Sequence, residues 1–185
     1  VSTAEEASLL HDQIDALNHL SFYLIEPMVD YAAALHYAMI ALELAQQSGT
    51  MAQLADSHFV IAEVYSETQD DQFIRQYEHA QRALALAQQS GNKLAEAGSY
   101  RIFARIAAMR DGNAEQAEDF VQKSLSLYQE TGQLLNAGRV HNAASAFIND
   151  KNLQLKHNLL ALRLAREINN VVMELLAGNN RAYLL

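Results

Sequence analysis

One nine-residue segment occurs almost unchanged at two places in this chain. Residues 41–49 read ALELAQQSG and residues 83–91 read ALALAQQSG. Both have apolar residues at helical spacing, then polar residues and a glycine, which is typical of a helix that ends at a left-handed residue. A third copy, SLSLYQETG, ends at Gly132, and a fourth, ALRLAREIN, ends at Asn169, where asparagine replaces glycine. The spacings of 42, 41 and 37 residues between these ends predict a repeated helical unit.

Each period contains two helical patterns separated by turn residues. We expect a single domain with repeats over about residues 3–49, 50–91, 92–132 and 133–169, followed by a terminal helix over 170–185. The expected helices span residues 3–25, 28–48, 51–66, 73–90, 93–110, 114–131, 133–148, 152–168 and 170–185. No strand-like alternation is present. The sequence predicts an all-α fold, an α-α superhelix of about four helical hairpins plus a terminal helix.

The start of the second helix is predicted from Pro27. A proline fits in the first turn of a helix because its missing N–H has no partner there. We therefore expect the second helix to begin at Met28.

Alanines recur along one face of the second helix in the first two repeats. They are Ala34, Ala38, Ala41 and Ala45 in the first repeat, and Ala80, Ala83 and Ala87 in the second. Residues at this spacing lie on one side of a helix. The small side chains predict close contact between neighbouring helices.

These residues resemble the tetratricopeptide repeat superfamily. IAEVY at 61–65 and RIFARIAA at 101–108 are similar to the core of its first helix, and QRALALA at 81–87 is similar to the core of its second. The chain departs from the family pattern because it has no tryptophan and its period is longer. The longer period resembles repeats in bacterial regulators, namely the sensor arms of MalT-like transcription activators and the peptide-pheromone receptors of the Rap and PlcR type. ADSHFVIAEVY, at 55–65, is similar to the latter.

Composition argues against several classes of partner. The net charge of -9 disfavours binding to nucleic acid, and no apolar run reaches the length of a membrane span. The first thirteen residues are acidic, unlike a secretory signal, and the absence of cysteine fits a reducing cytosol. We expect a cytoplasmic location. A chain that starts with Val1 is expected to be a segment of a larger protein.

Motifs for catalysis are absent from the sequence. It has no glycine-rich phosphate loop, no His-Glu-x-x-His and no nucleophile elbow, so we expect neither an enzyme nor a cofactor. His11, Asp15 and His19 share a helix face, but a straight helix spreads them too far apart for one metal ion. We interpret them as a polar face and expect no metal site. The other histidines that we considered are scattered and are expected to be packing or surface residues: His36, His58, His79, His141 and His157.

The resemblance implies a concave groove lined by the first helix of each repeat. The residues placed there are Phe59, Glu63, Arg101, Arg105, Arg139, Asn142, Asn149 and Asn179. Asparagine can bracket a peptide amide because it both donates and accepts, and arginine can pair with a carboxylate. This pattern predicts an extended peptide or a protein partner. The alternative is that Arg101 and Arg105 pair with Glu63, Glu96 or neighbouring acids.

The predicted function is a non-enzymatic binding module, the sensory or scaffolding arm of a bacterial regulator. The alternative is a self-assembly module that forms homo-oligomers through its last helix. Ala177, Tyr183, Leu184 and Leu185 are expected to be uncovered there, and uncapped ends of helical repeats tend to associate.

Overall fold

The computed structural model describes residues 2–25, 28–48, 50–68 and 73–184. Within these residues the chain forms nine helices and no strand, which confirms the predicted all-α fold. The helices are α1 (Ser2–Ile25), α2 (Tyr31–Ser48), α3 (Met51–Glu67), α4 (Phe73–Ser90), α5 (Lys93–Met109), α6 (Ala114–Glu130), α7 (Leu134–Phe147), α8 (Lys151–Glu167) and α9 (Val171–Leu184).

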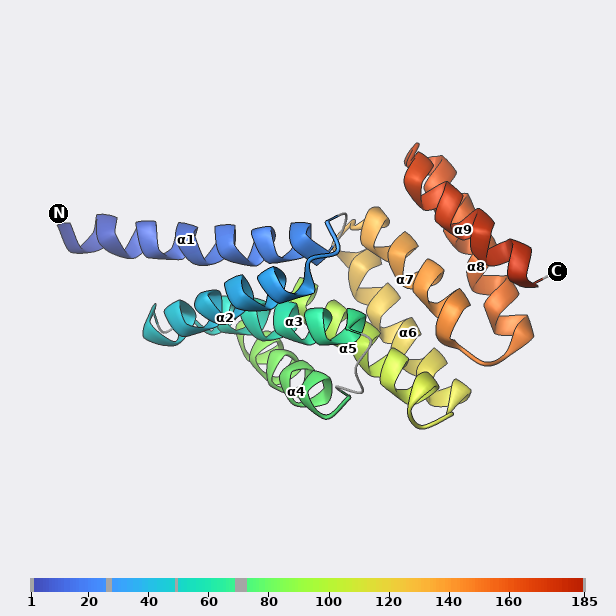
Figure 1. Ribbon diagram of the computed structural model, residues 1–185, viewed down its shortest axis with the longest axis horizontal. Helices are drawn as coiled ribbons and strands as arrows, with labels where there is room; N and C mark the ends of the chain where they lie inside the picture. The colour runs from blue at the N-terminus through green and yellow to red at the C-terminus, as the bar shows by residue number, and fades with distance from the viewer. Residues whose placement is uncertain (1, 26–27, 49, 69–72, 185) are drawn as a thin grey trace. The chain divides into compact units, whose positions relative to one another are not determined.

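Consecutive helices pack as hairpins, in the manner of an α-α superhelical repeat (Figure 1). Repeat 1 consists of α1 and α2, repeat 2 of α3 and α4, repeat 3 of α5 and α6, and repeat 4 of α7 and α8, with α9 following. The chain divides into an N-terminal part, Val1–Ile102, and a C-terminal part, Phe103–Leu185, and the boundary falls within α5. In the N-terminal part α3 packs on α1, α2 and α4, and in the C-terminal part α7 packs on α6, α8 and α9.

The predicted helix-end residues have the left-handed backbone that their identity suggests. Gly91, Gly132 and Asn169 have φ angles of 74°, 70° and 53°. After each of them a backbone N–H reaches back to close the helix: Asn92 to the Ala87 carbonyl at 2.9 Å, Gln133 to Tyr128 at 2.8 Å, and Asn170 to Ala165 at 2.8 Å. This is the Schellman motif. It confirms three of the four predicted ends, and Gly49 lies outside the described residues.

Asparagines at two of these junctions also start the following helix. The Oδ1 of Asn92 accepts a hydrogen bond from the Ala95 N–H at 3.1 Å. The Oδ1 of Asn170 accepts one from the Met173 N–H at 2.9 Å. One residue therefore closes one helix with its backbone and caps the next with its side chain, which fixes the direction change between repeats.

The start of α2 differs from the prediction. The helix begins at Tyr31 rather than Met28, and the Ala33 N–H donates to the Asp30 Oδ1 at 3.0 Å. Asp30 thus supplies the N-cap, while Val29 has a φ of 56° and is not helical. Pro27 lies outside the described residues. The other predicted helix ends agree with the structure to within one or two residues.

The predicted alanine face is buried in both hairpins. Ala34, Ala38, Ala41, Ala45, Ala80, Ala83 and Ala87 are all 0% exposed. Ala38 packs with Val60 and Ile61 of α3, whereas Ala41 and Ala45 pack against Ile14 of α1. The small side chains allow α2 to lie between two helices that bring larger apolar residues to it.

Candidate functional site

In the N-terminal part, the predicted groove residue Phe59 is a contact between helices. Its ring is half-buried, and its centroid lies 5.6 Å from that of Phe22 on α1. On the other side the ring lies against Gly98 of α5, so closely that a Cβ at Gly98 would overlap it. Phe59 therefore joins the first helices of three successive repeats.

Glu63 and Arg101 form an ion pair between α3 and α5. Only 10% of the Glu63 side chain and 18% of the Arg101 side chain are exposed. The second oxygen of Glu63, Oε2, is buried and has no hydrogen-bond partner among the described residues. The expectation of an accessible guanidinium is therefore not met at Arg101, and the ion-pair alternative holds for these two residues.

More of the predicted groove residues are accessible to solvent in the C-terminal part. Arg105 is half-buried, and its Nε donates to the Met109 sulfur at 3.4 Å. Arg139 on α7 is exposed and Asn142 on α7 is half-buried, Asn149 is exposed in the connection between α7 and α8, and Asn179 is exposed on α9. Arg101 belongs to the other part, so a groove shared by all three arginines stays a prediction.

An amide pair joins α7 to α9 beside these residues. The Nδ2 of Asn180 donates to the Asn142 Oδ1 at 3.0 Å and lies 3.4 Å from the Ser145 Oγ. Asn180 was not among the predicted residues, although its position next to Asn179 on the last helix could have suggested it. We call Arg139, Asn142, Asn149 and Asn179 the α7–α9 surface.

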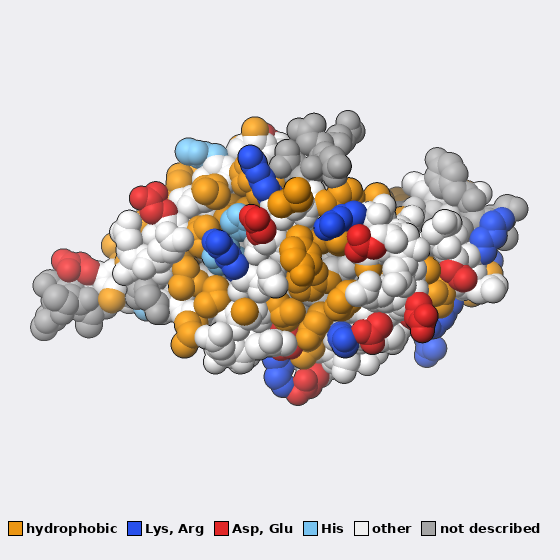
Figure 2. All heavy atoms as spheres, turned by 90° about the horizontal axis from the view of Figure 1, so that it is seen from below, with side chains coloured by type: hydrophobic (Ala, Val, Ile, Leu, Met, Phe, Trp, Pro, Cys, Tyr) orange, Lys and Arg blue, Asp and Glu red, His pale blue; other side chains and the backbone are white. Residues whose placement is uncertain are grey.

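The chemistry of the α7–α9 surface is that of hydrogen bonding with one positive charge. The amides can donate and accept, and the guanidinium of Arg139 can bind a carboxylate with two parallel N–H bonds. Elsewhere, on the face drawn in Figure 2, basic side chains lie beside acidic ones. Exposed ion pairs of this kind include Lys123 with Asp119 and Arg166 with Glu174, both at 2.7 Å.

Four histidines described above as scattered form two pairs. The Nδ1 atoms of His58 on α3 and His79 on α4 are 3.0 Å apart, and those of His141 on α7 and His157 on α8 are 2.8 Å apart. His58, His141 and His157 are buried, as expected of packing residues, but the pairing was not predicted. Their spacings along the chain differ because α7 and the turn after it are both shorter than α3 and the turn after it, which concealed the correspondence.

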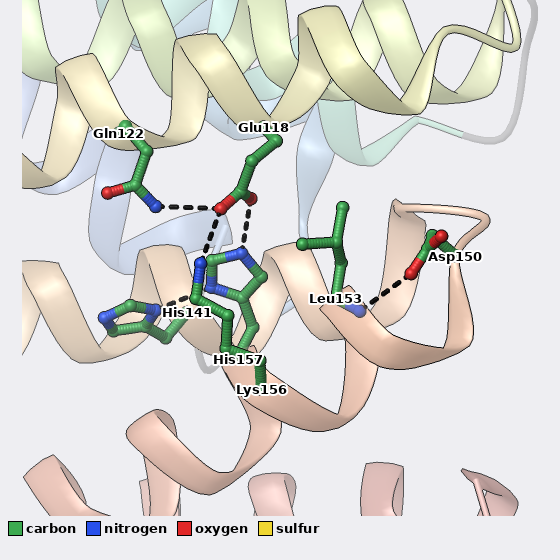
Figure 3. A network of polar contacts seen from close by, with 7 residues as sticks. All are labelled: Glu118, Gln122, His141, Asp150, Leu153, Lys156 and His157. Carbon is green, nitrogen blue, oxygen red and sulfur yellow. Dashed lines mark hydrogen bonds and ion pairs between the residues drawn. The ribbon is translucent and has the colours of Figure 1, made fainter.

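The second pair continues into a charged network (Figure 3). The Nε2 of His157 lies 2.6 Å from the Glu118 Oε2 on α6, and the Lys156 Nζ is 2.9 Å from the Glu118 Oε1. Burial raises the pKa of Glu118, but the hydrogen bonds from Lys156 and His157 outweigh burial, so that its pKa is below the usual value. Glu118 is therefore a carboxylate that accepts hydrogen bonds from two side chains of α8.

Burial lowers the pKa of His58, His79 and His141. The pKa of His58 falls to about 4 through burial and then through the charge of His79. That of His141 falls to about 4 through burial and then through His157. Burial also lowers the pKa of His79, with Arg82 adding to the shift. Each pair thus contains at least one imidazole that stays neutral at neutral pH, His58 in the first and His141 in the second.

The structure does not gather His11, Asp15 and His19 into a site. The Asp15 Oδ1 instead accepts from the Gln53 Nε2 at 3.1 Å, and the same nitrogen donates to the His11 carbonyl at 3.0 Å. Across the described part of the chain, no three His, Cys, Asp or Glu side chains lie together as metal ligands would.

The last helix buries one of the residues that we expected it to expose. Ala177 is 0% exposed and packs with Ala161 and Leu162 of α8, so its prediction was wrong. The side chains of Tyr183 and Leu184, and the whole of Leu185, lie outside the described residues. The large apolar residues exposed on α9 are instead Val171, Val172, Leu175 and Leu176, with 66%, 68%, 64% and 50% of their surface accessible.

Comparison with models of known protein families gives no match, and comparison with curated protein sequences gives none either. Family membership is therefore not shown by similarity. Of the helices in the described ranges, none has both the length and the apolar character needed to cross a membrane.

Proposed function

We propose that this chain is a non-enzymatic binding module of the tetratricopeptide type that recognises an extended peptide through the α7–α9 surface. The observation that supports this proposal is the set of hydrogen-bonding groups on α7, in the connection after it and on α9, of which Arg139, Asn149 and Asn179 are exposed, with α7 and α9 joined through Asn142 and Asn180. Asparagines at such positions can hold peptide amides in the absence of any sequence-specific pocket. Arg139 then selects a carboxylate, either an acidic side chain or a C-terminus.

The rigid backing of this surface is part of the proposal. Asn142 is held by Asn180, so its amide is oriented before a ligand arrives and loses little rotamer freedom on binding. The resemblance to long-period repeats places such a module in the sensory or scaffolding arm of a cytoplasmic bacterial regulator. The peptide is then either the signal itself or a segment of a protein partner.

Selection from a library of short random peptides with free C-termini tests this function. We expect enriched peptides that carry an acidic residue or rely on their terminal carboxylate. Arg139→Ala combined with Asn149→Ala should weaken their binding at least tenfold, about 1.4 kcal/mol, without loss of folding, because both residues are exposed. The matched control is Arg163→Ala with Asn152→Ala, which changes the same residue types at exposed positions of α8.

Two results would count against peptide binding. One is that no peptide is enriched above the level seen with the double variant. The other is that the α8 control weakens binding as much as the α7–α9 variant does.

A second candidate function, self-assembly, is supported by the exposed apolar residues of α9. Leu175 lies six residues after Asn169, the position that Gly138 holds after Gly132. Gly138 packs on α9, since a Cβ there would lie 2.6 Å from the Met173 sulfur. In α7 the residue at this position contacts α9, the helix that follows this repeat. In α9 the corresponding residue, Leu175, is exposed to solvent. A helix from a second copy of the chain could cover it.

Sedimentation velocity over a range of concentrations tests self-assembly. We expect concentration-dependent dimers that Leu175→Glu with Leu176→Glu abolishes. The control, Leu155→Glu with Leu159→Glu, places the same charges on exposed leucines of α8 and should leave the dimers intact. A monomer at every concentration would exclude this function.

A further inference from the structure

The two histidine pairs occupy the same positions in two different repeats. His58 and His141 each lie nine residues after a helix-end residue, at 49 and 132 respectively. His79 and His157 each lie twelve residues before one, at 91 and 169 respectively. The same contact between first and second helix is therefore made twice.

Repeat 3 lies between them and lacks both histidines. At the corresponding positions it carries Tyr100 and Phe120, neither of which changes charge between pH 4 and pH 7. Of repeats 2 to 4, the outer two therefore carry a histidine pair and the middle one does not.

Each pair can hold only one proton between its facing nitrogens. At 2.8 Å and 3.0 Å between Nδ1 atoms, one nitrogen must donate and the other accept. A proton on the accepting Nδ1 would turn two N–H groups toward each other at hydrogen-bond distance. The contact between the two helices then becomes repulsive instead of attractive.

The charges around each pair decide which imidazole can become cationic. Around His141 and His157 they are Glu118 of α6 and Lys156 of α8. The Glu118 carboxylate beside His157 accommodates a positive charge on that ring, so His141 is the acceptor that must stay neutral. Glu174 of α9 is engaged with Arg166.

The first pair has a different charged environment. Around His58 and His79 the charges are Arg82 and Glu78, both of α4. The ring of Tyr65 on α3 lies 6.0 Å from that of His79. Arg82 opposes a positive charge on either imidazole, so both rings are held neutral.

We propose that the two histidine pairs are acid-sensitive latches that hold the first and second helices of repeats 2 and 4 together at neutral pH and release them in mild acid. Opening frees His58 and His141 to take up a proton at the ordinary imidazole pKa of about 6.5. The closed hairpin takes up the same proton only near pH 4. Stability is therefore complete above about pH 6.5 and is lost as the pH falls from there toward 4.

The size of the effect follows from the number of protons. For each histidine that is protonated only in the open form, the ratio of open to closed hairpins rises about tenfold per pH unit within the window. The helices of repeats 2 and 4 should therefore lose amide protection faster than α6, which belongs to the hairpin without the pair.

Amide hydrogen exchange of the full chain between pH 7 and pH 4.5 tests the proposal. Protection factors are corrected for intrinsic exchange, and a chelator excludes bridging metal ions. We expect protection in α3, α4, α7 and α8 to fall by at least about tenfold per pH unit relative to α6. His141→Asn keeps an amide near the Nδ1 position but does not titrate, so it should remove this slope in α7 and α8 only. His58→Asn should do the same in α3 and α4 only.

Each variant controls for the other, and His36→Asn controls for the loss of a histidine outside the pairs. Should either paired variant fail to fold, nitrogen chemical shifts of the imidazoles in the unaltered chain decide the question. His141 should then titrate well below the ordinary imidazole pKa of about 6.5. The proposal would be overturned by equal pH dependence of α6 and the hairpins of repeats 2 and 4, by an unchanged slope in His141→Asn, or by titration of His141 near the ordinary imidazole pKa of about 6.5.

Discussion

Glu63 on α3 and Arg101 on α5 form a largely buried ion pair that joins the first helices of repeats 2 and 3. Removing one partner leaves the other charge buried and unpaired, which is much more costly than replacing both. We expect Arg101→Ala to lower the free energy of unfolding by about 3 kcal/mol, measured by urea denaturation.

The double variant Arg101→Met with Glu63→Leu removes both charges but keeps side chains of similar volume, so it distinguishes the cost of an unpaired charge from the cost of lost packing. Apolar residues of similar volume should recover most of the lost stability. If Arg101→Ala changes the unfolding free energy by less than about 0.5 kcal/mol, the pair contributes no more than an exposed ion pair does, which contradicts this prediction.

The alanine face predicts an overpacking effect. Ala83 is 0% exposed on α4, so Ala83→Leu should lower the unfolding free energy by about 1–3 kcal/mol because the added atoms have no space. Ala85, two residues along the same helix, is exposed. Ala85→Leu should be close to neutral, since the two residues have similar helix propensities. Equal effects of the two changes in thermal unfolding would place Ala83 away from a helix contact.

Two helical glycines should respond in opposite directions to the same substitution. At Gly98 a Cβ would overlap the ring of Phe59, whereas at Gly178 it would meet nothing within 4 Å. Gly98→Ala should therefore destabilise the chain by about 1–3 kcal/mol, and Gly178→Ala should stabilise it by up to about 1 kcal/mol through helix propensity. Combining Gly98→Ala with Phe59→Leu should recover part of the loss. Melting temperatures that move in the same direction for both glycines would contradict this prediction.

The carboxylate of Asp56 carries an unfavourable charge. Burial raises its pKa, and the nearby Asp15 adds to the rise, while a hydrogen bond from Asn92 and the charge of His19 oppose it. A raised folded pKa favours the protonated form, so the contribution of Asp56 is lost as the pH rises from its ordinary value of 3.8 through the folded value. Asp56→Asn keeps the oxygen that accepts from Asn92 at 2.9 Å and removes the charge.

We expect Asp56→Asn to melt at a higher temperature than the unaltered chain at pH 7 and at the same temperature near pH 3. Asp12→Asn removes an exposed charge of the same sign on α1 and should change the melting temperature little at either pH. A lower melting temperature for Asp56→Asn at pH 7 would show that the charge stabilises the junction.

The helix ends and the alanine face were predictable because each depends on local geometry. A left-handed residue at a helix end favours glycine or asparagine, and a buried helix face keeps a fixed spacing. The start of α2 was mispredicted because two signals compete within four residues, and the capping carboxylate of Asp30 sets the boundary instead of Pro27.

The candidate site was less predictable because its contacts cross between helices. Whether Arg101 is open or buried depends on how closely α3 and α5 approach, and that distance is set by Gly98 and Phe59. The histidine pairs were missed because their partners are 21 and 16 residues apart. Counting from the nearest helix end would have aligned them.

The junctions built on Asn92 and Asn170 have a consequence for how such a chain can evolve. Each junction carries its own stop and start signals within a few residues, with the stop made by the backbone and the start by the same residue's side chain. A gene segment that begins and ends at two such junctions would encode the residues that close one helix and cap the next at each of its ends. Recombination between repeats could therefore lengthen or shorten the array by whole hairpins without first disrupting a helix, and the near-identical nine-residue segments would be natural sites of that exchange.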